Sequence, residues 1–332
     1  MISAPQPVPT PVVPLVAVAG PTASGKSALA AWLAERLNGE VVACDSTQIY
    51  RHFDIGTAKP RADEQRGIPH HLIDLLEPEE IFTAGDYRRR AEPVLEDLRR
   101  RGKLPILTVG TGLYLRALLE GLADAPERSE KLRARLTARA RVRGPEHLHR
   151  LLQRLDAGAA KRIAVRDQPK LIRAIEVCLL AGRPISDVHR EGRPKLEGFQ
   201  PMKVGLMPPR AALYERIEQR VNTMLERGWL REVRDLVACG VPADAKPFQF
   251  IGYGELRSHL AGEMSLEQSV AAIQEVTRRY AKRQITWFRK EPGVRWFEGF
   301  GDDPEIHRCV LAFLEEQLPA GHSFRARPVQ GV

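Results

Sequence analysis

The chain has 332 residues, of which 43% are hydrophobic and 28% are charged, the profile of a globular protein with more than one small core. No apolar run approaches the roughly 18–20 residues that span a membrane, so we expect no membrane partner. The formal net charge is +9, and residues 128–173 alone hold 14 Lys/Arg against 4 Asp/Glu. Such an excess favours a polyanionic partner, although a solvated helical face would show the same pattern.

The termini and the cysteines suggest where the protein works. The N-terminal prolines interrupt any apolar stretch, so we expect a disordered tail at 1–14 rather than a signal peptide, and a second tail at 319–332. The four cysteines are widely separated and form no Cys-x-x-Cys pair. That usage argues against a zinc site or a disulfide framework and predicts a cytoplasmic protein.

Short apolar runs alternate with helical patterns along much of the chain, which predicts a parallel α/β sheet flanked by helices. In chain order, the predicted strands are Leu15–Ala19, Glu40–Ala43, His71–Leu76, Leu104–Val109, Lys203–Met207 and Val294–Phe297. Helices are predicted over 28–37 and 87–101, after Gly112, and over 211–227, 230–238 and 266–289.

Between residues 125 and 200 the pattern changes to Arg-rich helical segments with no strand signal. Helices are predicted over 128–143, 145–155 and 169–181, followed by a loop over 182–201. We therefore predict an α/β core from residues 15–124 and 201–318, interrupted by an all-helical insertion at 125–200.

A phosphate-binding motif joins the first strand to the first helix. Backbone N–H groups of such a loop point at an oxyanion, and its lysine contacts phosphate oxygens. The Ser27 hydroxyl would bind Mg²⁺, the expected cofactor. The core is therefore predicted to be P-loop NTPase-like and to bind a di- or triphosphate. The residues that fit G-x-x-x-x-G-K-[ST] are Gly20, Pro21, Thr22, Ala23, Ser24, Gly25, Lys26 and Ser27.

One acidic residue follows a strand at the same edge of the sheet as this loop. Asp45 comes directly after the second strand, where it is a candidate metal ligand or general base. The strand Leu104–Val109 ends in Gly110–Thr111, without the acid that ATP-hydrolysing P-loop proteins place there. A small-molecule or nucleotide kinase and a non-catalytic RNA-binding protein both stay open as alternatives.

Several blocks of the sequence resemble the tRNA dimethylallyltransferases, also called isopentenyl-tRNA transferases. The family implies a P-loop core with an inserted helical lobe that grips the anticodon stem-loop of tRNA. It implies transfer of a dimethylallyl group from dimethylallyl diphosphate to the adenosine 3′ of the anticodon, in tRNAs reading U-starting codons, by a protein expected to be monomeric. The matching blocks are Asp45–Arg51, Asp54–Pro60, His70–Asp74, Gly110–Tyr114, Arg216–Arg220 and Ala281–Trp287.

The resemblance also implies roles for single residues. Asp45 would accept the proton of the adenine amine, Lys26 and Arg220 would hold the diphosphate, and Thr111 would contact the substrate. Tyr253 is expected to stack on a base or to lie in the core, and Trp287 and Phe288 are expected in the core. The candidate tRNA ligands are Asp45, Ser46, Thr47, Gln48, Thr111, Arg133, Asp167, Lys170, Arg173, Phe250, Gly252, Tyr253, Lys282, Arg283 and Arg289.

Overall fold

The computed structural model describes residues 12–191 and 194–318, so most of both predicted tails lies outside the described residues. The chain divides into two compact units. The first comprises residues 1–118 and 197–332, and the second comprises residues 119–196. The bounds of the second unit lie a few residues before those predicted for the helical insertion. Over 12–191 and 194–318, none of the helices has both the length and the apolar character needed to cross a lipid bilayer.

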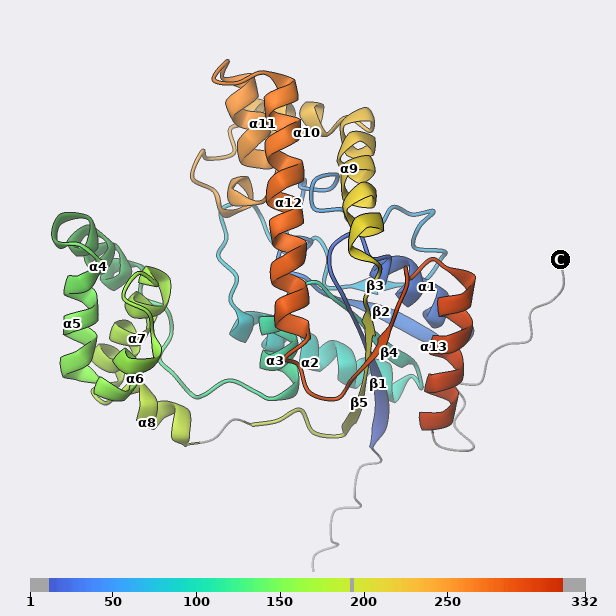
Figure 1. Ribbon diagram of the computed structural model, residues 1–332. Coiled ribbons are helices and arrows are strands. Elements are labelled where there is room, and N and C mark those ends of the chain that lie inside the picture. Colours follow the sequence, from blue (N-terminus) through green and yellow to red (C-terminus); the bar gives the residue numbers. More distant parts are fainter. Residues whose placement is uncertain (1–11, 192–193, 319–332) are drawn as a thin grey trace, which may run out of the picture. The chain divides into compact units, whose positions relative to one another are not determined.

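The first unit is built on a six-stranded parallel sheet in the order β3-β2-β4-β1-β5-β6 (Figure 1). The predicted parallel α/β fold is confirmed. The strand bounds are β1 Val13–Ala19, β2 Gly39–Cys44, β3 His70–His71, β4 Leu104–Val109, β5 Phe199–Leu206 and β6 Val294–Phe297.

Four strands differ from their predicted bounds. β2 is one residue longer at each end, and β5 begins at Phe199, inside the loop predicted over 182–201, and ends at Leu206. The differences at β3 and β1 have identifiable reasons. The strand expected over His71–Leu76 is wrong beyond His71, because Leu72 and Asp74 adopt positive φ angles of 62° and 53° that an extended strand does not hold. Val13 and Pro14 were placed in the N-terminal tail but belong to β1, where they pair with the first residues of β5. That pairing brings together segments far apart in the sequence, which local patterns do not reveal.

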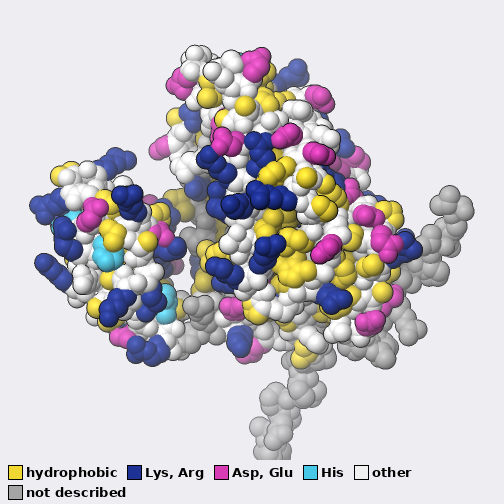
Figure 2. Space-filling view, viewed as in Figure 1, with side chains coloured by type: hydrophobic (Ala, Val, Ile, Leu, Met, Phe, Trp, Pro, Cys, Tyr) yellow, Lys and Arg dark blue, Asp and Glu magenta, His cyan; other side chains and the backbone are white. Residues whose placement is uncertain are grey.

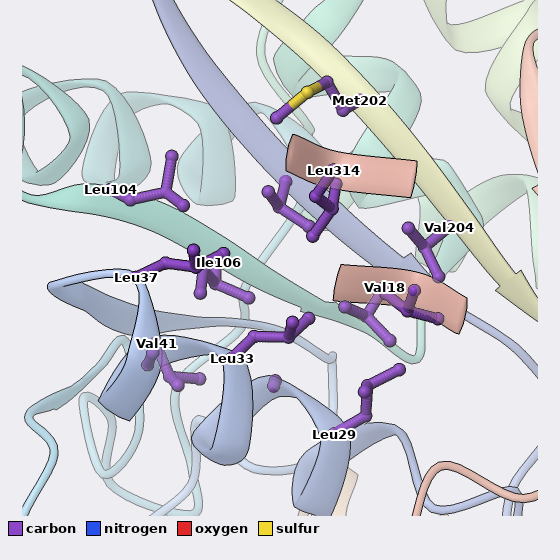
Figure 3. Packing of buried hydrophobic residues seen from close by; sticks show 14 of the residues in the cluster. Val18, Leu29, Leu33, Leu37, Val41, Leu104, Ile106, Met202, Val204 and Leu314 are labelled. Carbon is purple, nitrogen blue, oxygen red and sulfur yellow. The ribbon is translucent and has the colours of Figure 1, made fainter. Parts of the chain in front are cut away.

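Helices cover both faces of this sheet. α1 (Lys26–Arg36) and α13 (Pro304–Gln317) bury one face, where Leu29 and Leu314 meet Val18 (Figure 3). Because side chains alternate along a strand, the other face of β4 is free to pack against α2 (Ala84–Arg100). The helix α3 (Gly112–Leu119) follows β4, whereas α13 was not among the predicted helices.

The C-terminal helices form a second core above the P-loop. They are α9 (Arg210–Glu226), α10 (Trp229–Ala238), the 3₁₀ helix η1 (Lys246–Gln249), α11 (Tyr253–Leu260) and α12 (Leu266–Phe288). Ala23 of the P-loop packs against Leu213 and Ile217 of α9 and Ala281 of α12. The two long helices, which lie against each other, therefore cover the tip of the P-loop.

All the regular secondary structure described in the second unit is helical. Its helices are α4 (Glu130–Arg143), α5 (Pro145–Leu155), α6 (Ala157–Arg162), α7 (Gln168–Ala181) and α8 (Ile185–Arg190). They enclose a separate core in which Leu148, Leu152, Leu171 and Ile175 are fully buried. The loop predicted over 182–201 is wrong at α8, because Ile185 and Val188 gain burial against this core.

Candidate active site

The loop between β1 and α1 has the backbone shape of an anion cradle. Gly20, Ala23 and Gly25 have positive φ angles of 156°, 63° and 85°. The Ser24 N–H donates to the Pro21 carbonyl over 3.2 Å, and the N–H of Gly301 donates to the Ser24 carbonyl over 2.8 Å. A Cβ added at Gly25 would lie 2.7 Å from the Gly301 nitrogen, so this close approach requires glycine.

A cavity of about 750 Å³ lies beside this cradle, inside the first unit. Its size is that of a small-molecule site. Five of the eight motif residues line it, namely Thr22, Ala23, Gly25, Lys26 and Ser27, whereas Gly20, Pro21 and Ser24 do not. Residues from other elements also line it, including Asp45, Thr47, Gln48, Gly110, Arg220, Tyr280 and Gln284. The structure thus brings the predicted cradle, Asp45 and Arg220 together in one cavity.

Lys26 and Arg220 are among the cationic side chains that line this cavity. Burial lowers the pKa of Lys26 to about 8, even though the Asp45 carboxylate acts to raise it, and the positive charge of Arg220 lowers it as well. The Lys26 ammonium donates to the Pro21 carbonyl over 2.8 Å. Arg220 is half-buried, burial lowers its pKa, and it forms no ion pair with any residue in 12–191 or 194–318. A phosphate would favour the charged form of both groups.

The Asp45 carboxylate is held in place by its neighbours. Its Oδ1 accepts hydrogen bonds from the Thr47 N–H at 2.8 Å and from the Thr47 hydroxyl at 2.7 Å. Its Oδ2 packs against Gly110, where an added Cβ would lie only 2.0 Å away. A side chain at position 110 would therefore displace the carboxylate.

The Thr111 side chain, predicted to contact the substrate, bonds the loop that carries Asp45. It does not line the cavity. Its hydroxyl accepts from the Ser46 N–H at 3.0 Å and donates to the Ser46 hydroxyl at 3.1 Å. These bonds join the loop after β4 to the loop after β2, so Thr111 supports the segment that carries Asp45 and does not contact the cavity directly.

Sequence reasoning missed the cavity residues of α12, which are Ile273, Thr277, Tyr280 and Gln284. Tyr280 and Gln284 lie four residues apart and share a helix face. Burial raises the pKa of the Tyr280 hydroxyl, and the nearby Asp45 carboxylate raises it further. Gln284 is 6% exposed and bonds the backbone on both sides of the cavity. Gln284 lies inside the Ala281–Trp287 block and Tyr280 directly precedes it, and this position is the signal that would have found them.

The chemistry of the donors at this site fits a phosphate-bound Mg²⁺. In the described part of the chain, no group of three or more His, Cys, Asp or Glu side chains could hold a metal ion. The Ser27 hydroxyl is exposed in the first turn of α1 and lines the cavity with Asp45. A Mg²⁺ ion there would take most of its ligands from phosphate oxygens and water, as Mg²⁺ commonly does.

Three predicted tRNA ligands belong to the second core of the first unit. Tyr253 is fully buried, and its hydroxyl donates to the Glu232 carboxylate over 2.7 Å. A Cβ at Gly252 would lie 1.9 Å from the Trp229 ring. Phe250 is half-buried against the Tyr50 ring, with centroids 5.7 Å apart. Of the two positions expected for Tyr253, the one in the core is confirmed and base stacking is wrong, because the core encloses its ring.

Three exposed basic side chains on α12 and just beyond it have no acidic partner among the described residues, unlike Arg278 and Arg279, which are ion-paired. Lys282, Arg283 and Arg289 are exposed and form no ion pair with residues of the described ranges. Figure 2 shows Lys and Arg side chains gathered over the part of the surface where α12 lies. This surface keeps the charges that a phosphate backbone would need.

The aromatic pair at the end of α12 divides between core and surface. Phe288 is 1% exposed, as predicted. Trp287 was expected in the core but is 39% exposed, because its ring packs on the edge of the structure against Gly112, with the Arg116 guanidinium 4.8 Å from its ring centroid.

The predicted RNA ligands of the second unit all form ion pairs within that unit. Glu176 is fully buried and accepts two hydrogen bonds from Arg133, each at 2.9 Å, and one from Arg173 at 2.7 Å. Although burial acts to raise it, these bonds hold the pKa of Glu176 below its ordinary value.

Asp167 caps α7 and pairs with the exposed Lys170. A cavity of about 610 Å³ beside α4 is lined by Arg128, Arg133, Arg141 and Gln168 among others.

A parallel sheet, a P-loop cradle and a facing carboxylate define a P-loop enzyme that acts on a diphosphate or triphosphate. Comparison with known proteins gives the family. The model of the family described as IPP transferase matches residues 48–291. A tRNA dimethylallyltransferase of Solibacter usitatus is 52% identical over 298 residues, 90% of this chain and 97% of that protein. One of Geobacter metallireducens is 46% identical over 299 residues, with 90% and 97% covered.

Solved structures agree with this assignment. A full-length tRNA isopentenylpyrophosphate transferase from Bacillus halodurans matches with a TM-score of 0.67 and 38% identity, covering 92% of this chain and 97% of that one. A eukaryotic dimethylallyltransferase, solved in snapshots of its action on tRNA, matches with a TM-score of 0.79 and 26% identity, covering 94% and 81%. The chain therefore belongs to the IPP transferase family, and it is a prenyltransferase of the tRNA dimethylallyltransferase type. The predicted resemblance is confirmed.

Proposed function

We propose that the protein transfers a dimethylallyl group from dimethylallyl diphosphate to the exocyclic amine of the adenosine 3′ of the tRNA anticodon and releases diphosphate. The observation that carries the proposal is that Asp45, Lys26 and Arg220 line one cavity with the P-loop. A carboxylate beside cations without their own acidic partners suits a reaction that needs a proton acceptor and an anionic leaving group.

On the donor side, the chain supplies positive charge. As the bond between the allylic carbon and the bridging oxygen breaks, negative charge grows on the diphosphate. Lys26, Arg220 and the cradle N–H groups would stabilise that charge, and such preorganised donors commonly supply the largest catalytic term. When bound, Mg²⁺ supplies further positive charge at the phosphate oxygens, with Ser27 as its protein ligand.

On the acceptor side, the chain supplies a base and a path for RNA. Asp45, fixed by Thr47 and Gly110, would take a proton from the amine as the new carbon–nitrogen bond forms. The adenine must leave its stack to reach Asp45, which loop nucleotides permit at low cost. We propose that Lys282, Arg283 and Arg289 bind the RNA backbone, and that the exposed basic residues of α4 and α7 do so as well.

The two alternatives explain fewer features of the cavity. A kinase would bind ATP, yet β4 is followed by Gly110 and Thr111 where such proteins place a Mg²⁺-binding acid. A non-catalytic RNA-binding protein has no use for a carboxylate facing a phosphate cradle. We further propose a cytoplasmic monomer that acts on tRNAs reading codons that start with U.

Mass spectrometry of tRNA nucleosides tests this function. The protein is incubated with Mg²⁺ and bulk tRNA, together with labelled dimethylallyl diphosphate in one arm and ATP in the other. The expected result is adenosine heavier by one dimethylallyl group, formed only in the first arm. Turnover of ATP with no label in tRNA would identify a kinase, and tRNA binding without turnover of either compound would identify an RNA-binding protein.

A further inference from the structure

One buried side-chain amide bonds both the P-loop and the loop after β4. Gln284 lies on α12 and is 6% exposed. Its Oε1 accepts a hydrogen bond from the Thr22 N–H at 2.7 Å, and its Nε2 donates to the Gly110 carbonyl at 2.9 Å. The backbone fixes this orientation, because the Thr22 N–H can only donate and the Gly110 carbonyl can only accept.

One backbone partner of Gln284 belongs to the diphosphate site, and the other lies against the base. Thr22 is part of the phosphate cradle, so its N–H group sets the cradle's shape. Gly110 is the residue against which the Asp45 Oδ2 packs. The Gly110 N–H also donates to the Cys44 carbonyl, directly before Asp45, over 3.1 Å. One side chain from a distant helix therefore joins the diphosphate site to the loop that holds the base.

We propose that Gln284 is a positioning residue for prenyl transfer, which fixes the distance between the phosphate cradle and the Asp45 carboxylate. Each end of its amide is engaged by backbone, so it acts through Thr22 and Gly110. The inference rests on the proposed function, because the fixed distance is the one between leaving group and base. A misplacement of about 1 Å between reacting groups lowers rates on the order of 10²-fold.

Only glutamine satisfies both bonds at neutral pH. Leucine keeps most of the volume but removes the donor and the acceptor. Glutamate keeps the shape, but its ionised form places negative charge against the Gly110 carbonyl and the cradle. Once protonated, the same carboxyl accepts from the Thr22 N–H and donates to the Gly110 carbonyl, so it can replace the amide.

The test compares Gln284→Leu and Gln284→Glu with Gln274→Glu, the same substitution at a half-buried position elsewhere on α12 that does not line the cavity. Steady-state transfer is measured from pH 5.5 to 8.5, as a ratio to wild type at each pH to cancel titration of other groups. We expect Q284L to lose about 10²-fold in kcat, with KM for tRNA changed less than about threefold. The Q284E ratio should rise as pH falls, because burial raises the pKa of a carboxyl group.

A structural role alone predicts something different. If Gln284 only fills space, Q284E will match Q274E at every pH, or the loss in both Gln284 variants will follow their loss of folded protein in a thermal melt. Either result overturns the proposal.

A second measurement does not depend on prenyl transfer. Calorimetric binding of inorganic pyrophosphate with Mg²⁺ should be about tenfold weaker in Q284L than in wild type, because the Thr22 segment of the cradle is no longer held in place by Gln284. If wild type binds pyrophosphate but transfers no prenyl group, the proposed function fails while this comparison still tests Gln284. If wild type transfers and Q284L matches it in both measurements, the function stands and the role of Gln284 is refuted.

Discussion

The arginines predicted to be functional differ between the two units in whether an acidic side chain pairs with them. In the α/β unit, Arg220 is half-buried in the cavity and forms no ion pair with any residue of the described ranges. In the helical unit, Arg133 and Arg173 both bind the fully buried Glu176. Desolvating an unpaired cation costs free energy that a ligand must recover, whereas a paired one can stabilise the fold alone. We therefore propose that pairing, more than local charge density, separates the functional arginines of this protein from its structural ones.

The largest expected effect concerns the base beside the unpaired cations. Asp45→Asn keeps the acceptor for the Thr47 bonds but cannot take a proton, so kcat should fall on the order of 10³-fold. Single-turnover transfer with labelled donor measures this, and filter binding of tRNA serves as control because affinity should change little. Turnover close to wild type would reject Asp45 as the base.

The next largest effect is expected for Arg220→Gln, which should lower the rate of transfer without lowering the melting temperature. Removing a leaving-group cation should lower kcat/KM about 10²-fold, since single charge-stabilising donors have effects of that order. Because its buried charge lacks an acidic partner, the ligand-free protein should melt no lower than wild type. Arg220→Lys should recover part of the rate. A strongly lowered melting temperature in Arg220→Gln would place Arg220 among the structural arginines.

In the helical unit the same reasoning predicts a loss of stability. Glu176→Ala leaves Arg133 and Arg173 unpaired, and removing one partner of a buried ion pair costs about 3 kcal/mol or more. Hydrogen exchange in peptides of α4 and α7 measures this against peptides of β1 and β4, which should not change.

The pKa of Glu176 is lowered in the folded state, so its stabilising contribution is complete above the unfolded pKa and disappears as pH falls through the folded pKa. Unchanged exchange in α4 would contradict this structural role.

Titration of Lys26 should make the affinity for pyrophosphate depend on pH. Burial lowers its pKa to about 8 in the free protein, and only the protonated form attracts diphosphate. Pyrophosphate affinity should therefore fall about tenfold for each pH unit above 8. Lys26→Arg does not titrate in this range and serves as the reference, so parallel profiles for the two proteins would contradict the assignment.

The smallest effects are expected at the unpaired surface cations of α12. Lys282→Gln and Arg283→Gln should each weaken tRNA binding about threefold and reduce the dependence of log affinity on log salt by about one phosphate contact. The same measurement on a substitution of the exposed Arg139 of α4 compares the helical unit with α12. If Lys282→Gln and Arg283→Gln leave the salt dependence unchanged, the RNA path does not include α12.

The sequence predicted features that depend on local patterns. The P-loop motif and the alternation of apolar runs with helices identified the cradle and the parallel sheet. Features set by contacts between distant segments were missed or wrong. The burial of Tyr253 depends on Trp229 and Phe53 around it, the Glu176 pairing depends on the packing of α4 against α7, and the bonds of Gln284 join three separate segments. No local pattern reports such contacts.

The central claim is that one cavity holds a departing diphosphate and the base that accepts the proton. A crystal structure with pyrophosphate and Mg²⁺ bound tests it most directly. We predict pyrophosphate in the cradle, with Lys26, Arg220 and the loop N–H groups in contact with its oxygens and the Asp45 carboxylate facing the same cavity. An empty cradle, or Asp45 turned away from the bound pyrophosphate, would contradict the mechanism.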